Sequence, residues 1–294
     1  MRALLAALLA AAAWTLAACA PAAPPAPTPA IWRISDADSE IWLFGSVHLL
    51  PPELDWRSAE VEAAFNGADE FVTETDTGPE AAASFAALAQ RYGRLPADET
   101  LADRIGAAEA ARLARLAAGL GIDPAALAAE RPWLAALQLS YSYAVRAGQS
   151  PDHGVDTVLA DDARRQGKRL TFFETPEQQI RVLADLPRDA EAHFLSLTMD
   201  QVEAGDDQMD VMDRAWVSGD TATLERLLAA EWRESGDAVH DALILRRNRA
   251  WAENIEQRLH GSGRAFITVG AAHLLGEGSV VALLRERGVR VEGP

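Results

Sequence analysis

The chain has 294 residues, of which 44 are acidic and 27 basic, so its formal net charge is −17 at pH 7. A surface this acidic repels nucleic acid and anionic lipid, and we expect no nucleic-acid partner. The sequence lacks the G-x-x-x-x-G-K and G-x-G-x-x-G patterns of phosphate-binding loops, and Lys168 is its only lysine, which argues against a phosphate site.

The N-terminal segment has the pattern of a targeting signal and is not expected to join the fold. A positive charge at Arg2 precedes an apolar run over residues 3–13, which predicts a secretory signal peptide over residues 1–18. The Leu-Ala-Ala-Cys ending resembles a bacterial lipobox, in which Cys19 becomes the lipid-modified first residue of the mature protein. A membrane-spanning helix is the alternative, but the apolar run is short for a bilayer.

Cys19 is the chain's only cysteine, so a mature lipoprotein would contain no free thiol, disulfide or cysteine-rich zinc site. Residues 20–30 are rich in Pro and Ala, which is typical of an extended linker. We therefore expect residues 19–30 to form a lipidated tether, followed by a single folded domain over residues 31–294. Ala20 stands where an Asp would favour retention in the inner membrane of a Gram-negative cell. We expect an exported protein, anchored by its N-terminal lipid to the periplasmic face of the outer membrane.

The folded part is expected to begin and end with strands. Residues 31–34 and 41–47 flank a polar turn and predict a β-hairpin. A helix over residues 58–66 and a strand over residues 70–76 follow. The last expected elements are a strand over residues 265–270, a helix over 279–287 and a strand over 289–292.

The middle of the chain is expected to be helical, apart from one strand over residues 169–174. Helices are predicted over residues 79–92, 107–118, 124–130, 133–145, 155–166, 176–186, 189–204, 208–217, 221–232 and 238–259. The order of elements predicts an α/β fold. We expect a central mixed β-sheet built from two pseudo-equivalent halves, each a strand, a GxxH motif, a helix and a strand, with a large all-helical middle insertion.

Two short stretches carry the same pattern although 225 positions separate them. Gly45-Ser46-Val47-His48 and Gly270-Ala271-Ala272-His273 each follow an apolar strand and precede a Leu-Leu pair. An imidazole titrates near neutrality and binds metals when neutral, so a strand that ends on histidine suits a base or a ligand. One such motif is most simply a strand cap, but two in matched surroundings favour a shared functional site.

Two carboxylates are expected near these histidines. Glu74 lies on the strand over residues 70–76, and Glu174 ends the strand over residues 169–174. A buried carboxylate costs free energy unless a cation neutralises it. Two His with one or two Glu make a plausible ligand set for Zn²⁺, Mn²⁺ or Co²⁺.

Two of these candidates have simpler interpretations as well. Glu174 has a second interpretation as the cap of a helix that begins near Pro176, where a carboxylate suits the helix dipole. Arg247, in an Arg-rich run, is either a cation for these carboxylates or part of a solvated helix face.

These stretches, together with the strand that carries Glu74 and the pair Arg247-Asn248 followed by Trp251, resemble the TraB/GumN (TraB/PrgY) family. The resemblance covers about residues 31–293. The family is similar to the Tiki metalloproteases and more distantly to erythromycin-esterase-like and haem-binding ChaN-like proteins. Ser46 stands in the first motif where Thr is the more frequent residue.

The resemblance implies a metal-dependent peptidase or hydrolase with a peptide or protein substrate. His48, Glu74 and His273 would hold a divalent ion of undetermined identity, Mn, Co or Zn, and Arg247 would lie in the same cleft. Either Glu74 or Glu174 would act as general base, and Arg247 would stabilise the oxyanion or bind a substrate carboxylate.

A second hypothesis belongs to a different functional class. Because no general base is unambiguous from the sequence, the same cleft would also suit a non-catalytic envelope lipoprotein that captures a peptide or haem. Metal dependence and turnover distinguish the two hypotheses.

Overall fold

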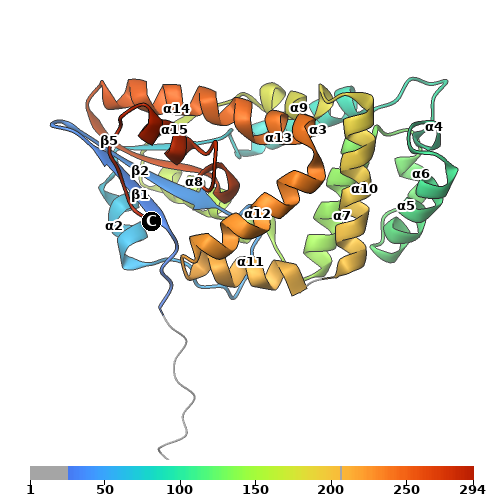
Figure 1. The fold of residues 1–294 in the computed structure, drawn as a ribbon, viewed down its shortest axis with the longest axis horizontal. Coiled ribbons are helices and arrows are strands. Elements are labelled where there is room, and N and C mark those ends of the chain that lie inside the picture. The colour runs from blue at the N-terminus through green and yellow to red at the C-terminus, as the bar shows by residue number, and fades with distance from the viewer. Residues whose placement is uncertain (1–25, 206) are drawn as a thin grey trace, which may run out of the picture.

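A computed structural model describes residues 26–205 and 207–294 of the chain. The predicted signal peptide, Cys19 and the first part of the tether lie outside the described residues. The described part forms a β-sheet flanked by helices, with a helical extension on one side (Figure 1). None of the described helices is long and apolar enough to cross a membrane.

The core of the structure is one six-stranded mixed sheet, as predicted. Its strands are β1 (Ile31–Ser35), β2 (Ser39–Ser46), β3 (Glu70–Thr73), β4 (Arg169–Phe172), β5 (Gly263–Gly270) and β6 (Val291–Glu292), in the spatial order β4-β3-β5-β2-β1-β6. The predicted hairpin of β1 and β2 is antiparallel, and β6 pairs antiparallel with β1. Strands β2, β5, β3 and β4 run parallel to one another.

Strands β2 and β5 lie side by side although they come from opposite ends of the chain. Their register pairs Gly45 with Val269 and Ser46 with Gly270. The two GxxH motifs therefore leave the sheet at the same carboxyl edge. In open α/β sheets this edge is where ligands bind.

The two halves share the predicted order of elements but not the same crossover. Helix α2 (Ala59–Gly67) leads from β2 to β3, which lies one strand away beyond β5. Helix α15 (Val280–Glu286) leads from β5 to β6, which lies beyond both β2 and β1. Ser58 caps α2 by accepting a hydrogen bond from the Val61 amide, as its residue type favours.

Aromatic side chains join the sheet to the helices on its two faces. On one face Phe65 of α2 packs edge-on against Phe71 and Phe266 of the sheet. On the other face Trp251, from α14 (Arg246–Leu259), stacks on Phe173 at 5.2 Å. Such aromatic pairs stabilise a core beyond the area that they bury.

The remaining helices form the middle of the chain. They are α3 (Pro79–Gly93), α4 (Leu101–Ile105), α5 (Ala107–Gly119), α6 (Pro124–Leu127), α7 (Pro132–Arg146), α8 (Val155–Arg165), α9 (Pro176–Ala184), α10 (Arg188–Ala204), α11 (Asp207–Val217), α12 (Thr221–Ser235) and α13 (Asp237–His240). The chain also contains three short helical turns, η2 (Pro151–His153), η3 (Asp241–Leu245) and, directly after β5, η4 (Ala271–His273). An ion pair between partly buried Arg131 and buried Glu191 joins α7 to α10, and Arg131 also donates to the Ala184 carbonyl.

Several predicted elements differ from the structure. The strand expected over residues 169–174 ends at Phe172, so Glu174 lies beyond its end. The strand expected over residues 70–76 ends at Thr73, so Glu74 lies just beyond its end. Helix α4 was missed, although Thr100 and Asp103 form a capping box at its start. The helix expected over residues 238–259 is interrupted by the π-helical turn η3, a feature frequent near functional sites.

Candidate functional site

The site lies at the carboxyl edge of β2 and β5, where each motif's glycine makes room for its neighbours. A Cβ at Gly45 would lie 3.0 Å from the Ala271 Cα, in the other motif. A Cβ at Gly270 would lie 3.3 Å from Glu74 Oε1 and 3.8 Å from His48 Nε2. Both glycines thus permit a close approach of the two motifs and of Glu74, which any side chain would hinder.

Glu74 is the buried carboxylate of the site. Its Oε1 accepts a hydrogen bond from the Gly270 amide at 2.7 Å. Its Oε2 accepts hydrogen bonds from Arg247 at 2.5 Å and from Gln179 at 3.1 Å. Burial by itself would raise the pKa of Glu74, but the surrounding positive charges and the Gly270 amide lower it to about 2. The carboxyl group is therefore ionised at neutral pH.

Arg247 binds both candidate carboxylates and is only 11 % exposed. Its Nε and Nη2 form a bidentate pair with Glu174 at 2.7 and 2.9 Å, and Nη2 also donates to Glu74. Its Nη1 contacts the Leu243 carbonyl and His273 Nε2, each at 3.2 Å. All five N–H groups of the guanidinium thus have a partner, and its Cζ lies 4.5 Å from the centre of the Trp251 ring.

His273 is buried and held by a buried amide. Its Nδ1 lies 2.6 Å from Oδ1 of Asn248, whose Nδ2 donates to the Gly278 carbonyl. Because the amide nitrogen is engaged by Gly278, Oδ1 is the acceptor and His273 Nδ1 carries the proton. Burial lowers the pKa of His273 to about 3. The ring is therefore neutral at pH 7, and the lone pair of Nε2 points toward Arg247 and Glu74.

His48 has a carboxylate partner of its own but is far more open to solvent. Its Nδ1 lies 2.6 Å from Asp156 Oδ2, and its side chain is 58 % exposed. The Asp156 carboxylate raises the pKa of His48 to about 9. Asp156 belongs to the first turn of α8, which begins directly after Gly154. With Nδ1 bound to Asp156, Nε2 is the nitrogen that remains for a ligand or substrate.

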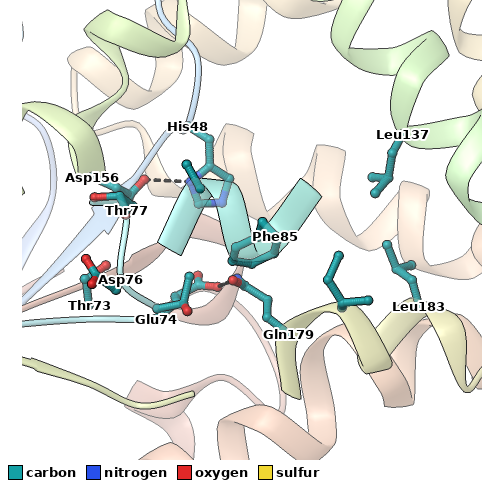
Figure 2. A pocket seen from close by; sticks show the side chains of 13 residues that line it. His48, Thr73, Glu74, Asp76, Thr77, Phe85, Leu137, Asp156, Gln179 and Leu183 are labelled. Atoms are coloured by element: carbon teal, nitrogen blue, oxygen red, sulfur yellow. Dashed lines mark hydrogen bonds and ion pairs between the residues drawn. The ribbon is translucent and has the colours of Figure 1, made fainter. Parts of the chain in front are cut away.

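A cavity of about 530 Å³ opens at this edge. Figure 2 shows His48 and Glu74 at one end and Leu137 and Leu183 at the other. Further lining residues are Thr73, Thr75, Asp76, Thr77, Ala82, Phe85, Asp156, Gln179 and Ile180. A mostly apolar cavity with a few convergent polar groups is typical of small-molecule and peptide sites.

The structure brings the five candidate residues of the predicted site together. Arg247 directly contacts Glu74, Glu174 and His273, and His48 lies across Gly270 from Glu74. Glu174 does not cap the following helix with its side chain; Thr175 does.

The same residues are not gathered as metal ligands. No group of three or more His, Cys, Asp or Glu within residues 26–205 and 207–294 lies close enough to hold a metal ion. Arg247 Nη1 occupies the position next to His273 Nε2 that a metal would take.

The chemistry of the donor set nevertheless suits a divalent ion. Each imidazole has its Nδ1 bound to an oxygen, which is how outer residues orient histidine ligands. The site contains three carboxylates, from Glu74, Glu174 and Asp156, and one guanidinium, from Arg247. The net charge of these groups is therefore −2 when both imidazoles are neutral. An incoming dication would balance this charge.

Sequence reasoning missed three residues of the site, Asp156, Gln179 and Asn248. Asp156 and Gln179 lie in helices far along the chain from the groups that they contact, with no local pattern to mark them. Asn248 stands beside Arg247 in the motif that carries the family resemblance, and that adjacency was the available signal.

Comparison with known proteins gives the chain's relatives. The profile of the TraB/PrgY/gumN family matches residues 30–293. The chain is 26% identical over 257 residues to "Uncharacterized protein YbaP" of Escherichia coli (strain K12), covering 87% of this chain and 92% of that protein. It is 26% identical over 243 residues to the protein of the same name from Shigella flexneri, covering 83% and 87%. No solved structure matches. The chain belongs to the TraB/PrgY/gumN family.

Proposed function

We propose that the protein is a metal-dependent hydrolase of the cell envelope that cleaves peptide bonds, with His48, Glu74 and His273 as ligands of a Mn, Co or Zn ion. One observation carries the proposal: two imidazoles from distant parts of the chain flank one buried carboxylate, each with its Nδ1 bound to an oxygen. Purely structural histidines would not need matched orientation toward a common carboxylate.

The protonation states support ligand roles for two of the three residues. His273 is neutral and Glu74 ionised at pH 7, which are the forms that bind metals. His48 is protonated in the absence of metal, so binding an ion would release its proton. Binding would also require Arg247 to give up its contact with His273 Nε2.

A divalent ion held there would lower the pKa of a bound water and polarise a scissile carbonyl. Of the two carboxylates, Glu74 lines the cavity and Glu174 does not, so Glu74 is the one within reach of a substrate. Because the pKa of Glu74 is about 2, it is a weak proton acceptor and better suited to ligation. Arg247 positions both carboxylates, and stabilising an oxyanion would require it to release one of them.

The test is metal content and peptidase activity of the native protein, His48→Ala and His273→Ala. We expect both variants to lose metal and activity, while His260→Ala, an exposed histidine elsewhere on the surface, retains them. Unchanged activity in both site variants would end the proposal.

A second candidate function is a non-catalytic envelope lipoprotein that binds a peptide or haem in the same cavity. In its favour, each N–H of the Arg247 guanidinium already has a hydrogen-bond partner within the protein. The guanidinium therefore has no unused N–H to donate to an oxyanion. Stoichiometric binding without turnover, unaffected by a chelator, would support it against hydrolysis.

We also propose export and lipid anchoring through Cys19 to the periplasmic face of the outer membrane. The support is the lipobox-like sequence and the Pro-rich segment that follows it. Cys19→Ser should leave the membrane fraction. A variant that still sediments with membranes after a high-salt wash would show that lipid does not hold the protein there.

A further inference from the structure

The apolar end of the cavity continues onto the surface of helix α7. Leu137 lines the cavity and is also 38 % exposed. Tyr141 and Val145, 50 % and 43 % exposed, follow at intervals of four residues on the same helix. Residues four apart share a helix face, so the three side chains form one stripe that spans about 12 Å. We call Leu137, Tyr141 and Val145 the α7 stripe.

This stripe is unusual on the described surface. The exposed large hydrophobic side chains of residues 26–205 and 207–294 are Leu137, Tyr141, Val145, Phe172 and Val211. Three of these five thus fall on a single face of α7. Scattered exposed apolar residues are normal, whereas an ordered row that opens into a cavity marks a binding surface.

The chemistry of the cavity changes along its length in the direction of the stripe. Its charged side chains, among them His48 and Glu74, lie at the carboxyl edge of the sheet. The opposite end, toward the stripe, is lined by Leu137 and Leu183, and Phe85 lies between the two ends (Figure 2). Ile180 is a further apolar lining residue of the cavity. A ligand that reaches from one end to the other needs a polar group at the edge and apolar groups beyond it.

We propose that the cavity and the α7 stripe together bind an extended polypeptide segment with large apolar side chains. Its backbone amide would lie at His48 and Glu74, one apolar side chain among Phe85, Ile180 and Leu183, and the following ones on the stripe. The proposal rests on the proposed function of this site, and it names the substrate class. A small polar substrate would leave both the apolar end of the cavity and the stripe unused.

The test measures binding and cleavage separately. Two short fluorescein-labelled peptides of equal length and charge are compared, one carrying Leu and Phe and the other Ser at the same positions. Fluorescence anisotropy gives their affinity, and mass spectrometry detects cleavage. Tyr141→Asp places a charge in the stripe. Ser140→Asp places the same charge on the residue directly before Tyr141. Ser140 is also exposed but lies off the stripe.

We expect the apolar peptide to bind the native protein and Ser140→Asp alike, and Tyr141→Asp about tenfold more weakly. When cleavage is measured, Tyr141→Asp should raise KM and leave kcat unchanged, because the stripe binds the substrate and the transition state equally well. Equal affinity of the two peptides, or of the two variants, would overturn the proposal. Tight apolar binding without cleavage would sink the proposed hydrolysis and leave this inference standing.

Two other occupants of the stripe are tested with the same variant, Tyr141→Asp. A concentration-dependent dimer that Tyr141→Asp dissociates would assign the stripe to a second copy of the chain and overturn the proposal. Co-sedimentation of Cys19→Ser protein with phosphatidylcholine vesicles, lost on adding Tyr141→Asp, would assign it to a membrane and overturn it as well.

Discussion

Replacing Gly154 by alanine should disturb His48 without touching its side chain. A Cβ at Gly154 would lie 2.0 Å from the His48 carbonyl oxygen and 2.7 Å from its carbonyl carbon. Both are backbone atoms, which cannot rotate away as a flexible side chain can. Bringing the contact to an ordinary van der Waals distance of 3.4 Å requires the start of α8 to move by about 1.4 Å from the His48 backbone.

That displacement has a calculable cost. The hydrogen bond from the Val155 amide to the Val47 carbonyl, now 3.0 Å, would exceed hydrogen-bonding range. One lost backbone hydrogen bond costs about 1 kcal/mol, and overpacking typically adds 1–3 kcal/mol. We therefore expect Gly154→Ala to lower the free energy of unfolding by about 2–4 kcal/mol. The shift would also separate Asp156 from His48 Nδ1.

Urea denaturation gives the change in stability. The matched control is Gly119→Ala, because a Cβ at Gly119 meets nothing within 4 Å and its φ is not positive. The control should be neutral or slightly stabilising, since alanine restricts the unfolded chain. If Gly154→Ala is no less stable than Gly119→Ala, the close approach of α8 to the His48 backbone does not exist as described.

Two further substitutions test buried polar groups. Asn248→Leu leaves His273 Nδ1–H and the Gly278 carbonyl without partners, so urea denaturation should show a loss of about 2–5 kcal/mol. A loss below about 1 kcal/mol would contradict the amide's role. Burial raises the pKa of Glu130 although Gln138 donates to it, so its ionisation in the folded state opposes folding as pH rises above about 4. Glu130→Gln should therefore be more stable than the native protein at pH 7, by a margin that shrinks toward pH 4; a constant or reversed margin would refute this.

The meeting of the two histidines could be predicted because it depends on local patterns. Each GxxH motif follows an apolar strand, and parallel strands deliver their carboxyl ends to one edge. The class of the sheet and most helices followed from periodicity and caps in the same way. The end of β3 was misplaced because residues 74–76 continue its alternation while Glu74 turns toward the Gly270 amide.

The partners that orient the site could not be predicted for a physical reason. Asp156 meets His48 across 108 residues because Gly154 lets α8 approach the His48 backbone, a contact that leaves no periodic trace. The π-helical turn η3 keeps the hydrophobic pattern of a helix while shifting its register just before Arg247. Tertiary geometry of this kind becomes visible only once the chain is folded.

The most direct test of the central claim is a metal titration of the purified protein, read by isothermal calorimetry with Mn²⁺, Co²⁺ and Zn²⁺ in turn. We expect one high-affinity ion per chain for the native protein and for His260→Ala, and none for His48→Ala or His273→Ala. Metal binding should also release protons, because His48 is protonated in the free protein. Equal binding in the native protein and both site variants, or no binding at all, would contradict the central claim.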